Sequence, residues 1–538
     1  MTRAHRVHAR LTHALRPSAS TRAIPRARRR RAPVVAGAVA AVLALALSGC
    51  TSGSDDDGPT GPVTSSTPDT ASAPKGFESY YGQDVDWSKC GDGFRCATLK
   101  APVSWQDASS GDIDLAIKVH SATGTRVGAL LTNPGGPGAS GLDFVDSATS
   151  LFGSDVLKAY DVVGFDPRGV GKSTPVVCLG DKEKDAQLSA WYPDTEAGLA
   201  ANEKAASAWA DACKANTGPV LAHVDTQSAA RDMDLVRAVL GEKKLDYLGF
   251  SYGTQLGATY AGIFPDRVGR MVLDGAIDST LSADETGLEQ AVGFEDALRS
   301  YVKDCESGKG CPLTGGVDHG MSQIHDLLLR TERQPLKTKD ADRPLTATLA
   351  FYGVAVTLYS QDSWQYLTSA LSEALTQGTG TQLLALADFY NDRNSDGTFS
   401  TNSAEAFRAV GCLDDPGSTD LAAMKAQAEK IEAQAPTVGS FFTYGGIGCE
   451  PWPYPQVAQD FDLHAKGAPP IVVVGTTGDP ATPYRWAQGL AKTLDSGVLL
   501  TYEGEGHTAY SADNTCIAKA VDGYLVDGDV PDDGTTCS

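Results

Sequence analysis

One serine of the chain lies in the setting that a catalytic nucleophile requires. Residues 244–253 read Lys-Leu-Asp-Tyr-Leu-Gly-Phe-Ser-Tyr-Gly, so a strand-like run leads into the only Gly-x-Ser-x-Gly pattern, centred on Ser251. Apolar residues at helical spacing follow at once. A serine at such a sharp strand-to-helix turn can attack a carbonyl, and the flanking glycines remove Cβ atoms that would clash there. The pattern therefore predicts that Ser251 is a nucleophile for acyl transfer.

Two later residues have the types and the order needed to activate this serine. Asp479 lies in the loop after the apolar run Ile471–Gly475, and His507 follows the run Gly497–Tyr502 in a Gly-rich loop. A histidine can take the serine's proton when a carboxylate orients its ring, and this order along the chain suits loops that leave one sheet. We expect Asp479 and His507 to complete a catalytic triad with Ser251.

Two backbone N–H groups are candidates to stabilise the oxyanion of such a reaction. The loop Thr132–Gly138 reads Thr-Asn-Pro-Gly-Gly-Pro-Gly after an early apolar run, and its glycines let the backbone approach a substrate carbonyl. We expect the N–H groups of Gly136 and Tyr252 to donate to the oxyanion. The alternative is that this loop is an ordinary Gly/Pro turn.

Two other segments resemble binding motifs but lack an essential residue. Gly169–Ser173 looks like the end of a P-loop, yet Asp166 stands where that motif requires glycine. Asp392–Thr398 resembles the first half of a calcium-binding loop, yet its twelfth position is Ser403, which cannot supply the bidentate carboxylate. We expect neither nucleotide binding nor a calcium site, and interpret the second segment as a polar turn.

The proposed triad requires a sheet that brings distant loops to one edge, and the hydrophobic pattern predicts one. Six short apolar runs recur between helix-like stretches, after two alternating runs. Such runs are typical of parallel strands buried on both faces, and polar groups that follow them meet at the carboxyl edge of the sheet. We expect a doubly wound α/β fold with a mostly parallel, eight-stranded sheet, formed by residues 96–105, 113–120, 127–131, 160–165, 245–250, 268–273, 471–475 and 497–502.

A long insertion interrupts the strand pattern. Residues 279–463 read mainly as amphipathic helix, for example at 321–330 and 422–433. An insertion of about 185 residues is large enough to form a cap over the site. We therefore expect an α/β core in two parts, residues 76–278 and 464–538, with a mainly helical cap domain at 279–463.

The N-terminal segment has the features of an export signal. A basic cluster at residues 26–31 precedes the uncharged apolar run 34–47 and the sequence Leu-Ser-Gly-Cys, which ends at Cys50. This ending resembles the lipobox of bacterial lipoproteins, so residues 1–49 are expected to be removed and Cys50 lipidated. Residues 50–75, rich in Ser, Thr, Asp, Gly and Pro, are expected to form a disordered tether. The alternative is a secreted protein in which Cys50 has no role.

The cysteine count and the charge restrict the compartment and the partners. Of 11 cysteines, ten remain after Cys50. Sequential pairing is the simplest arrangement, and disulfides require an oxidising compartment. The first 50 residues hold ten Arg and no acid, which leaves 35 basic against 67 acidic residues, a net charge of −32, for the rest. So acidic a body disfavours nucleic acid as a partner. The expected pairs are Cys90 with Cys96, Cys178 with Cys213, Cys305 with Cys311, Cys412 with Cys449, and Cys516 with Cys537.

As a set, these motifs resemble the exported tripeptidyl aminopeptidase and lipoprotein protease family of the α/β-hydrolases, which is related to the prolyl iminopeptidases. The resemblance rests on Asn133–Gly138, on Asp161–Gly171 and on the Ser251, Asp479 and His507 regions, and it covers residues 76–538. The chain departs from the iminopeptidases at Pro134, where they carry His. The resemblance implies a serine peptidase that releases short peptides, typically tripeptides, from free N-termini, with no metal or organic cofactor.

The same motifs are compatible with two other functions. A carboxylesterase or lipase would use the same triad, and a non-catalytic surface lipoprotein would keep the fold without the activity. An aminopeptidase must also bind the substrate ammonium group, for which a buried carboxylate is the natural partner. Glu450, which lies between Cys449 and a Pro-Trp-Pro run, is our candidate. Asp414 and Asp415 are the alternatives.

Overall fold

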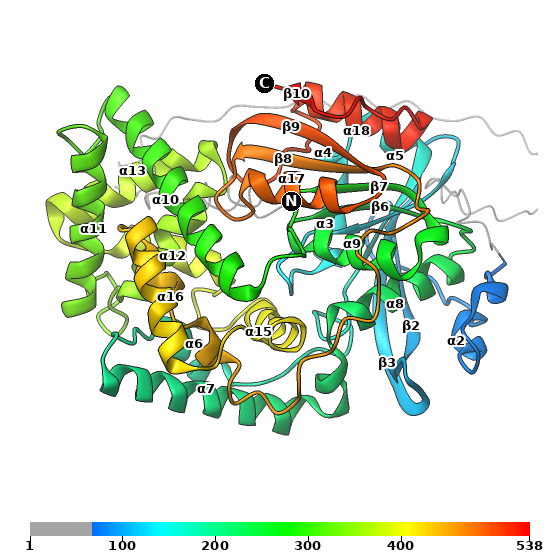
Figure 1. Ribbon diagram of the computed structural model, residues 1–538, viewed down its shortest axis with the longest axis horizontal. Helices are drawn as coiled ribbons and strands as arrows, with labels where there is room; N and C mark the ends of the chain where they lie inside the picture. Colours follow the sequence, from blue (N-terminus) through cyan, green and yellow to red (C-terminus); the bar gives the residue numbers. More distant parts are fainter. Residues whose placement is uncertain (1–66) are drawn as a thin grey trace, which may run out of the picture.

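The computed structural model describes residues 67–538 and consists of a central sheet flanked by helices, with a helical cap on one side (Figure 1). The predicted export signal, Cys50 and most of the predicted tether lie outside the described residues. Within residues 67–538, no helix is long and apolar enough to cross a membrane.

The sheet has ten strands in the order β1-β2-β3-β5-β4-β6-β7-β8-β9-β10. Pairing is antiparallel from β1 to β5 and parallel from β5 to β10. All eight predicted strands are present, and the two unpredicted ones, β1 and β10, are short strands at the edges. Their bounds are Ser88–Lys89 (β1), Phe94–Ser104 (β2), Asp107–His120 (β3), Gly128–Asn133 (β4), Tyr160–Phe165 (β5), Leu245–Phe250 (β6), Val268–Asp274 (β7), Ile471–Gly478 (β8), Gly497–Glu505 (β9) and Thr535–Cys537 (β10).

The apolar runs form strands because both faces of the sheet are covered. Alternate residues of β4, β6 and β8, such as Leu131 and Leu130, belong to two separate hydrophobic cores. Burial of each such side chain contributes roughly 1.5–3 kcal/mol. One face packs against α8 (Thr226–Val239), α9 (Tyr252–Ile263) and α17 (Tyr484–Thr493), and the other against α3 (Gly141–Val145), α4 (Ala148–Leu151), α5 (Ser154–Ala159) and α18 (Thr515–Asp527).

The predicted cap is helical and has a core of its own. Residues of α10 to α14, together with Ile431 of α16, form this separate cluster. Helix α15 differs, because Ala409, Val410 and Leu413 belong to the core beneath the sheet. The helices of the insertion are α10 (Ala283–Ser307), α11 (Val317–Arg333), α12 (Ala347–Leu358), α13 (Trp364–Ser372), α14 (Thr381–Tyr390), α15 (Ser403–Asp414) and α16 (Leu421–Gln434).

A second insertion, between β5 and α8, also joins the cap. Its helices α6 (Asp181–Ser189) and α7 (Glu196–Thr217) run along the lower edge of the view, beside α15 and α16 (Figure 1). Lys184 pairs with Glu405 of α15, and the Trp191 ring lies 5.0 Å from the Phe441 ring. From the sequence we expected this segment to belong to the α/β core, because a helix between two strands has the same hydrophobic pattern whether it packs on the sheet or on the cap.

Five disulfides stabilise this arrangement, and they join the pairs expected from sequential pairing. Each such link contributes about 2–4 kcal/mol, and disulfides persist only in oxidising compartments. Two of them are short-range links, each with a sequence separation of 6: Cys96 of β2 is bonded to Cys90, just after β1, and Cys311 is bonded to Cys305 in the last turn of α10.

The other three disulfides join elements that lie further apart in the chain. Cys178–Cys213 closes the second insertion, and Cys412–Cys449 joins α15 to the segment after α16. Cys516–Cys537 holds β10 against α18. The pairing of all ten cysteines that follow Cys50 is therefore the one that the sequence predicted.

The P-loop-like segment has a structural role. The Asp166 carboxylate accepts hydrogen bonds from Lys172 N at 2.9 Å and Ser140 Oγ at 2.6 Å, so a negative charge fills the turn where a phosphate would bind. Arg168 is fully buried and forms a bidentate pair with Asp232, with both distances 2.7 Å. The segment therefore anchors the β5 loop to α8, and the predicted absence of a nucleotide site agrees with this geometry.

Candidate active site

Ser251 lies at a strained turn between β6 and α9. Its backbone angles are φ 56° and ψ −125°, a conformation that residues with a Cβ atom rarely adopt. The neighbouring glycines allow it: a Cβ at Gly249 would lie 2.4 Å from Gly253 O, and one at Gly253 would lie 2.7 Å from Asn133 O. Any larger residue at either position would force the turn apart. The local sequence thus produces the strained strand-to-helix turn that was expected around Ser251.

Asp479 and His507 form the buried acid–base pair of the site. His507 Nδ1 lies 2.9 Å from both carboxylate oxygens of Asp479, whose side chain is 0% exposed. The carboxylate also accepts from the N–H groups of Ala481 and Thr482, each at 2.9 Å, and from Thr482 Oγ1 at 3.0 Å. Because Nδ1 donates to the carboxylate, Nε2 is left with its lone pair free to accept a proton.

The end of β7 connects the serine to the histidine loop. Ser251 N donates to Asp274 O at 2.9 Å, and the buried Asp274 carboxylate accepts from Ala509 N and Tyr510 N at 3.0 and 2.8 Å. A Cβ at Gly275 would lie 3.3 Å from His507 Cε1. Among the described residues no hydrogen bond joins Ser251 Oγ to His507, an open arrangement that is common before substrate binds.

Burial shifts the ionisation of Asp274. Removal from water raises its pKa from 3.8 to about 6, although the N–H groups of Tyr510 and Ala509 and the nearby His507 favour the charged form. Sequence analysis missed this residue. The available signal was an acid that ends an apolar run and lies next to a glycine, as Asp479 lies next to Gly478 after an apolar run.

The cap reaches the histidine. His507 N donates to Tyr359 O at 3.0 Å, and the Tyr359 ring meets the imidazole edge-on with centroids 5.3 Å apart. Gly506 also forms an isolated β-bridge with Ser360. The segment after α12 therefore supports His507 from the side opposite the sheet. No sequence signal pointed to Tyr359, because the contact joins residues that lie far apart in the chain.

The glycine-rich loop after β4 lies against the nucleophile turn. A Cβ at Gly135 would lie 2.8 Å from Ser251 Cβ and 3.1 Å from Tyr252 N, so only glycine fits there. Asn133 Oδ1 accepts from Gly135 N at 2.9 Å and fixes the loop. Within the described part of the chain, the N–H groups of Gly136 and Tyr252 have no hydrogen-bond partner. Both predicted donors are thus free at the correct edge of the sheet.

The structure does not bury Glu450, contrary to the expectation for an ammonium-binding acid. Its side chain is exposed, and its N–H merely closes a turn to Gly446 O. Asp415 is exposed as well and accepts from Ala283 N. Asp414 is the acid that lies beside the nucleophile turn: it accepts from Thr226 N at 2.9 Å and from Thr226 Oγ1, which in turn lies 2.6 Å from Tyr252 Oη.

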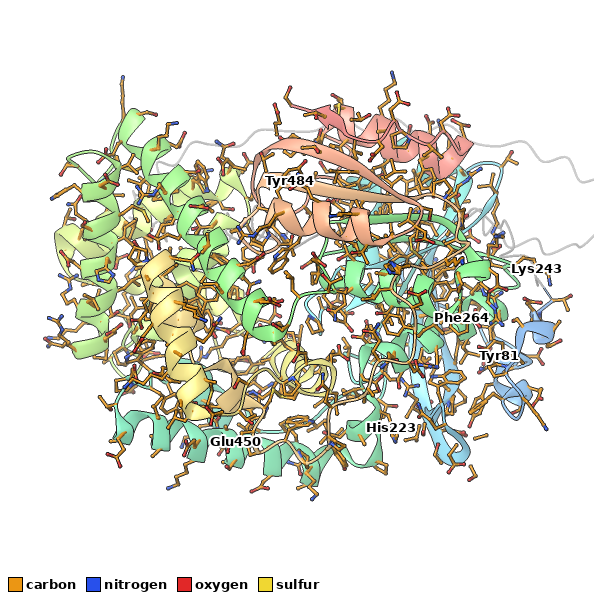
Figure 2. The ribbon with its side chains drawn as sticks, in the orientation of Figure 1. Tyr81, His223, Lys243, Phe264, Glu450 and Tyr484 are labelled. Atoms are coloured by element: carbon orange, nitrogen blue, oxygen red, sulfur yellow. A yellow bond between two sulfur atoms is a disulfide. The ribbon has the colours of Figure 1, made fainter. Side chains whose placement is uncertain are left out.

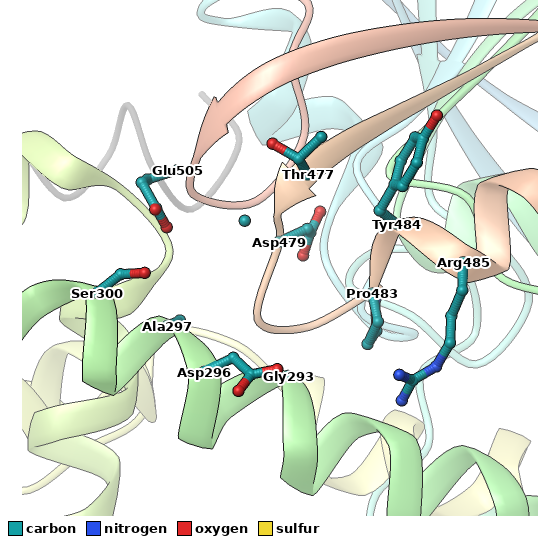
Figure 3. A pocket seen from close by; sticks show the side chains of 11 residues that line it. Gly293, Asp296, Ala297, Ser300, Thr477, Asp479, Pro483, Tyr484, Arg485 and Glu505 are labelled. Atoms are coloured by element: carbon teal, nitrogen blue, oxygen red, sulfur yellow. The ribbon is translucent and has the colours of Figure 1, made fainter. Parts of the chain in front are cut away.

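A cavity lies beside the acid loop (Figure 3). It measures about 300 Å³ and is bounded by α10 on one side and by the ends of β8 and β9 on the other. Asp296 and Ser300 of α10 face Thr477 and Glu505 across it (Figure 3). Asp479 is among the residues that line this cavity, whereas Ser251 is not. The cavity therefore adjoins the acid loop and not Ser251 itself.

The calcium-like segment is held by its own backbone hydrogen bonds. Asn394 N donates to Thr398 O at 2.8 Å, and Gly397 N donates to Asn394 O at 3.0 Å, which makes this segment a polar turn. Across residues 67–538 there is no cluster of three or more His, Cys, Asp or Glu side chains that could hold a metal ion.

Comparison with known proteins gives consistent relatives. Residues 435–537 match the family described as TAP-like protein. Serine protease Hip1 of Mycobacterium tuberculosis is 38% identical over 484 residues, 86% of this chain and 92% of that protein. Carboxylesterase B of the same species is 40% identical over 455 residues, 82% and 86% of the two chains. Tripeptidyl aminopeptidase of Streptomyces lividans is 30% identical over 475 residues, 84% and 86%.

Proposed function

The chain belongs to the TAP-like serine peptidases of the α/β-hydrolase fold, the family of the tripeptidyl aminopeptidases and of serine protease Hip1. We propose that it is an exported aminopeptidase that releases short peptides, typically tripeptides, from free N-termini. The observation that carries the proposal is the strained Ser251 at the same sheet edge as the buried Asp479–His507 pair. The cap contact at His507 favours a restricted cleft and hence an exopeptidase.

The proposed reaction is acyl transfer through a covalent intermediate. Ser251 Oγ attacks the scissile carbonyl while His507 Nε2 takes its proton, and Asp479 holds the imidazole and stabilises the imidazolium. The N–H groups of Gly136 and Tyr252 donate to the oxyanion. His507 then protonates the leaving amine, and water releases the acyl group by the same steps in reverse order. The chain's own residues supply every group that this reaction needs.

A carboxylesterase is the second candidate, because the relative named Carboxylesterase B is as similar to this chain as the proteases are. The same triad hydrolyses esters and amides, so the triad alone does not separate the two activities. What separates them is recognition of the substrate amine. An aminopeptidase needs an acid near the nucleophile, and Asp414 lies there.

We further propose that the protein is held at the outer face of the cell membrane through lipid on Cys50, with residues 50–75 as tether. The five disulfides support export, since they require an oxidising compartment. Processing at residue 49 would remove the basic N-terminal segment and leave the acidic body outside the cell.

A substrate panel tests the proposed activity. Chromogenic amides of one, two and three residues are compared with the N-acetylated tripeptide amide and with short acyl esters. We expect the free-amine tripeptide amide to have the highest kcat/KM among the amides, and acetylation to lower it by at least about 100-fold. Equal rates on the free and acetylated tripeptides would reject the aminopeptidase, and turnover of esters alone would establish the carboxylesterase.

A further inference from the structure

Helix α15 presents a face that the packing of the fold does not use. Phe407, Gly411 and Asp414 lie four and three positions apart and therefore share one side of the helix. Phe407 is 57% exposed, which is unusual for an aromatic residue, and a Cβ at Gly411 would meet nothing within 4 Å. The opposite side carries the buried residue Ala409, and the buried residues Val410 and Leu413 border the face on one flank. Open space and an exposed aromatic ring thus lie along one helix face.

Both ends of α15 are tied to the catalytic machinery. Its first turn contacts the oxyanion loop, since a Cβ at Gly138 would lie 2.7 Å from Ser403 O and 3.1 Å from Ala406 Cβ. At its last residue, the Asp414 carboxylate bonds to Thr226, whose hydroxyl is paired with the Tyr252 phenol. Tyr252 directly follows Ser251 in the chain, so the helix contacts the glycine-rich loop at one end and the side chain of Tyr252, through Thr226, at the other.

Asp414 is an acid without a cationic partner. Its bonds to Thr226 satisfy part of the carboxylate, but in the described residues no Lys, Arg or His forms an ion pair with it. The charged groups that act on it are acids as well: Asp225 at the start of α8 and Asp415 beside it. It also ends a twelve-residue helix, where the helix dipole favours a positive charge.

This environment disfavours the charged carboxylate in the absence of a ligand. Burial raises the pKa of Asp414 to about 7, and the charges of Asp225 and Asp415 act in the same direction, although the bonds from Thr226 oppose them. A cation placed against the carboxylate would offset both unfavourable effects.

We propose that Asp414 binds the α-ammonium group of the peptide substrate and that the Phe407–Gly411 face of α15 receives the first residues of the peptide. The inference rests on the proposed aminopeptidase function and identifies the group that would give it its selectivity. Only the Tyr252 phenol and the Thr226 hydroxyl separate Asp414 from the nucleophile turn. A peptide covers at most about 3.3–3.6 Å per residue, so a few residues bridge such a gap.

The position of Asp414 is fixed before substrate binds. Cys412, two residues earlier, is disulfide-bonded to Cys449. Gln456 Nε2 donates to Asp414 O and Val457 N donates to Leu413 O, each at 2.8 Å. A carboxylate held in this way loses little conformational freedom when it binds its partner, which favours tight recognition of a small charged group.

The first test replaces the charge and keeps the shape. With the free-amine tripeptide amide, Asp414→Asn is expected to lower kcat/KM about 10- to 100-fold, mainly through KM, because that is the worth of a hydrogen bond to a charged group. Rates on the acetylated amide and on a short acyl ester should stay within about twofold of the wild type, and the ester rate also shows that the variant folds. Asp414→Glu, which keeps the charge, should recover part of the loss.

Two comparisons make this test decisive. Asp326→Asn, an exposed acid on α11, removes the same charge elsewhere in the cap and should leave all substrates unchanged. If the wild type discriminates against acetylation and Asp414→Asn does so equally well, Asp414 is not the anchor and the aminopeptidase proposal survives. If the wild type itself cleaves free and acetylated peptides equally, the aminopeptidase proposal and this inference fail together.

The pH dependence provides an independent readout. We use the ratio of kcat/KM for free-amine over acetylated peptide, in which the titration of His507 cancels. Asp414 becomes protonated below about pH 7, and the peptide amine loses its proton above about pH 8. The ratio should therefore be largest between these values and fall on both sides, and in Asp414→Asn the acid-side fall should disappear. A ratio that stays constant from about pH 5 to 7 in the wild type would overturn the inference.

Discussion

At the scale of single residues, the site depends on hydrogen bonds that converge on two carboxylates. Asp479 receives three backbone N–H groups and the Thr482 hydroxyl, and Asp274 receives two N–H groups from the segment that follows His507. These bonds fix where the imidazole lies relative to Ser251. Thr482 and Asp274 are therefore positioning residues, and each leads to a prediction.

The Thr482 hydroxyl donates to Asp479 and lies 3.3 Å from His507 Nδ1. Thr482→Val removes the donor with little change in volume. We expect kcat to fall about 10-fold with KM nearly unchanged, because a bond to a charged group is lost while three backbone donors remain. Steady-state kinetics on the tripeptide amide measure the effect. An unchanged kcat would show that the backbone donors alone hold the pair.

The buried Asp274 carboxylate should make the stability of the protein depend on pH. Its pKa is about 6 in the folded protein against an ordinary value of 3.8, so the folded state binds the proton more tightly. As pH falls from about 6 to 4, the free energy of unfolding should therefore rise in the wild type relative to Asp274→Asn, by on the order of 2–3 kcal/mol. Denaturant unfolding at several pH values measures the difference, and one that does not vary with pH would contradict the assignment.

At the scale of secondary-structure elements, the three triad residues follow the carboxyl ends of β6, β8 and β9, and α15 lies beside the site that they form. Figure 2 shows the side chains of this part of the molecule. Glu450, labelled in Figure 2, lies at the bottom of the view near α7 and away from the sheet. The position of α15 depends on the Cys412–Cys449 disulfide and on core residues such as Val410.

The disulfide variant that combines Cys412→Ala with Cys449→Ala tests this dependence. We expect a loss of about 2–4 kcal/mol of unfolding free energy, because the unfolded chain regains freedom when the loop is opened. KM for free-amine peptides should rise more than KM for acyl esters, since the loosened element carries Asp414 and not the triad. The matched variant that combines Cys305→Ala with Cys311→Ala, within the cap, should affect stability without this difference between substrates. Equal changes in KM for both substrate classes would contradict the role of α15.

The elements predicted from the sequence are those whose pattern is local. The strand before Ser251, the glycines beside it and the loops that hold Asp479 and His507 all carry their information within short, continuous segments. The acid near the nucleophile could not be selected in this way: Glu450, Asp414 and Asp415 have similar sequence settings, and only packing against Thr226 distinguishes Asp414. The strands β1 and β10 were missed because two or three residues show no periodicity.

At the scale of the whole molecule, the cap is built from two insertions that are separated in sequence by α8, β6, α9 and β7. Helices α6 and α7 cover the lower side of α15 and α16, so the cap residue Glu405 is paired with Lys184 from the other insertion (Figure 1). The arrangement encloses the substrate side of the sheet edge. The sequence pattern predicted only the larger insertion, since the hydrophobic periodicity of a helix does not show whether that helix packs on the sheet or belongs to the cap.

The proposed lipid on Cys50 determines where the whole protein is located. Cys50→Ala should release the protein into the medium or block its processing, because the lipid is lost while the acidic body has no affinity for an anionic surface. Fractionation of cells followed by detection in membrane and soluble fractions measures this. A variant that stays with the membrane as fully as the wild type would contradict lipidation at Cys50.

The central claim is that Ser251 is the nucleophile of an acyl-transfer triad. The most direct measurement is the intact mass of the protein after reaction with a fluorophosphonate, followed by peptide mapping. We predict one adduct per chain, on Ser251, and none in Ser251→Ala, whose kcat should fall by on the order of 10⁴–10⁶ while its unfolding curve matches that of the wild type. An adduct on another residue, or labelling and turnover that persist in Ser251→Ala, would contradict the account.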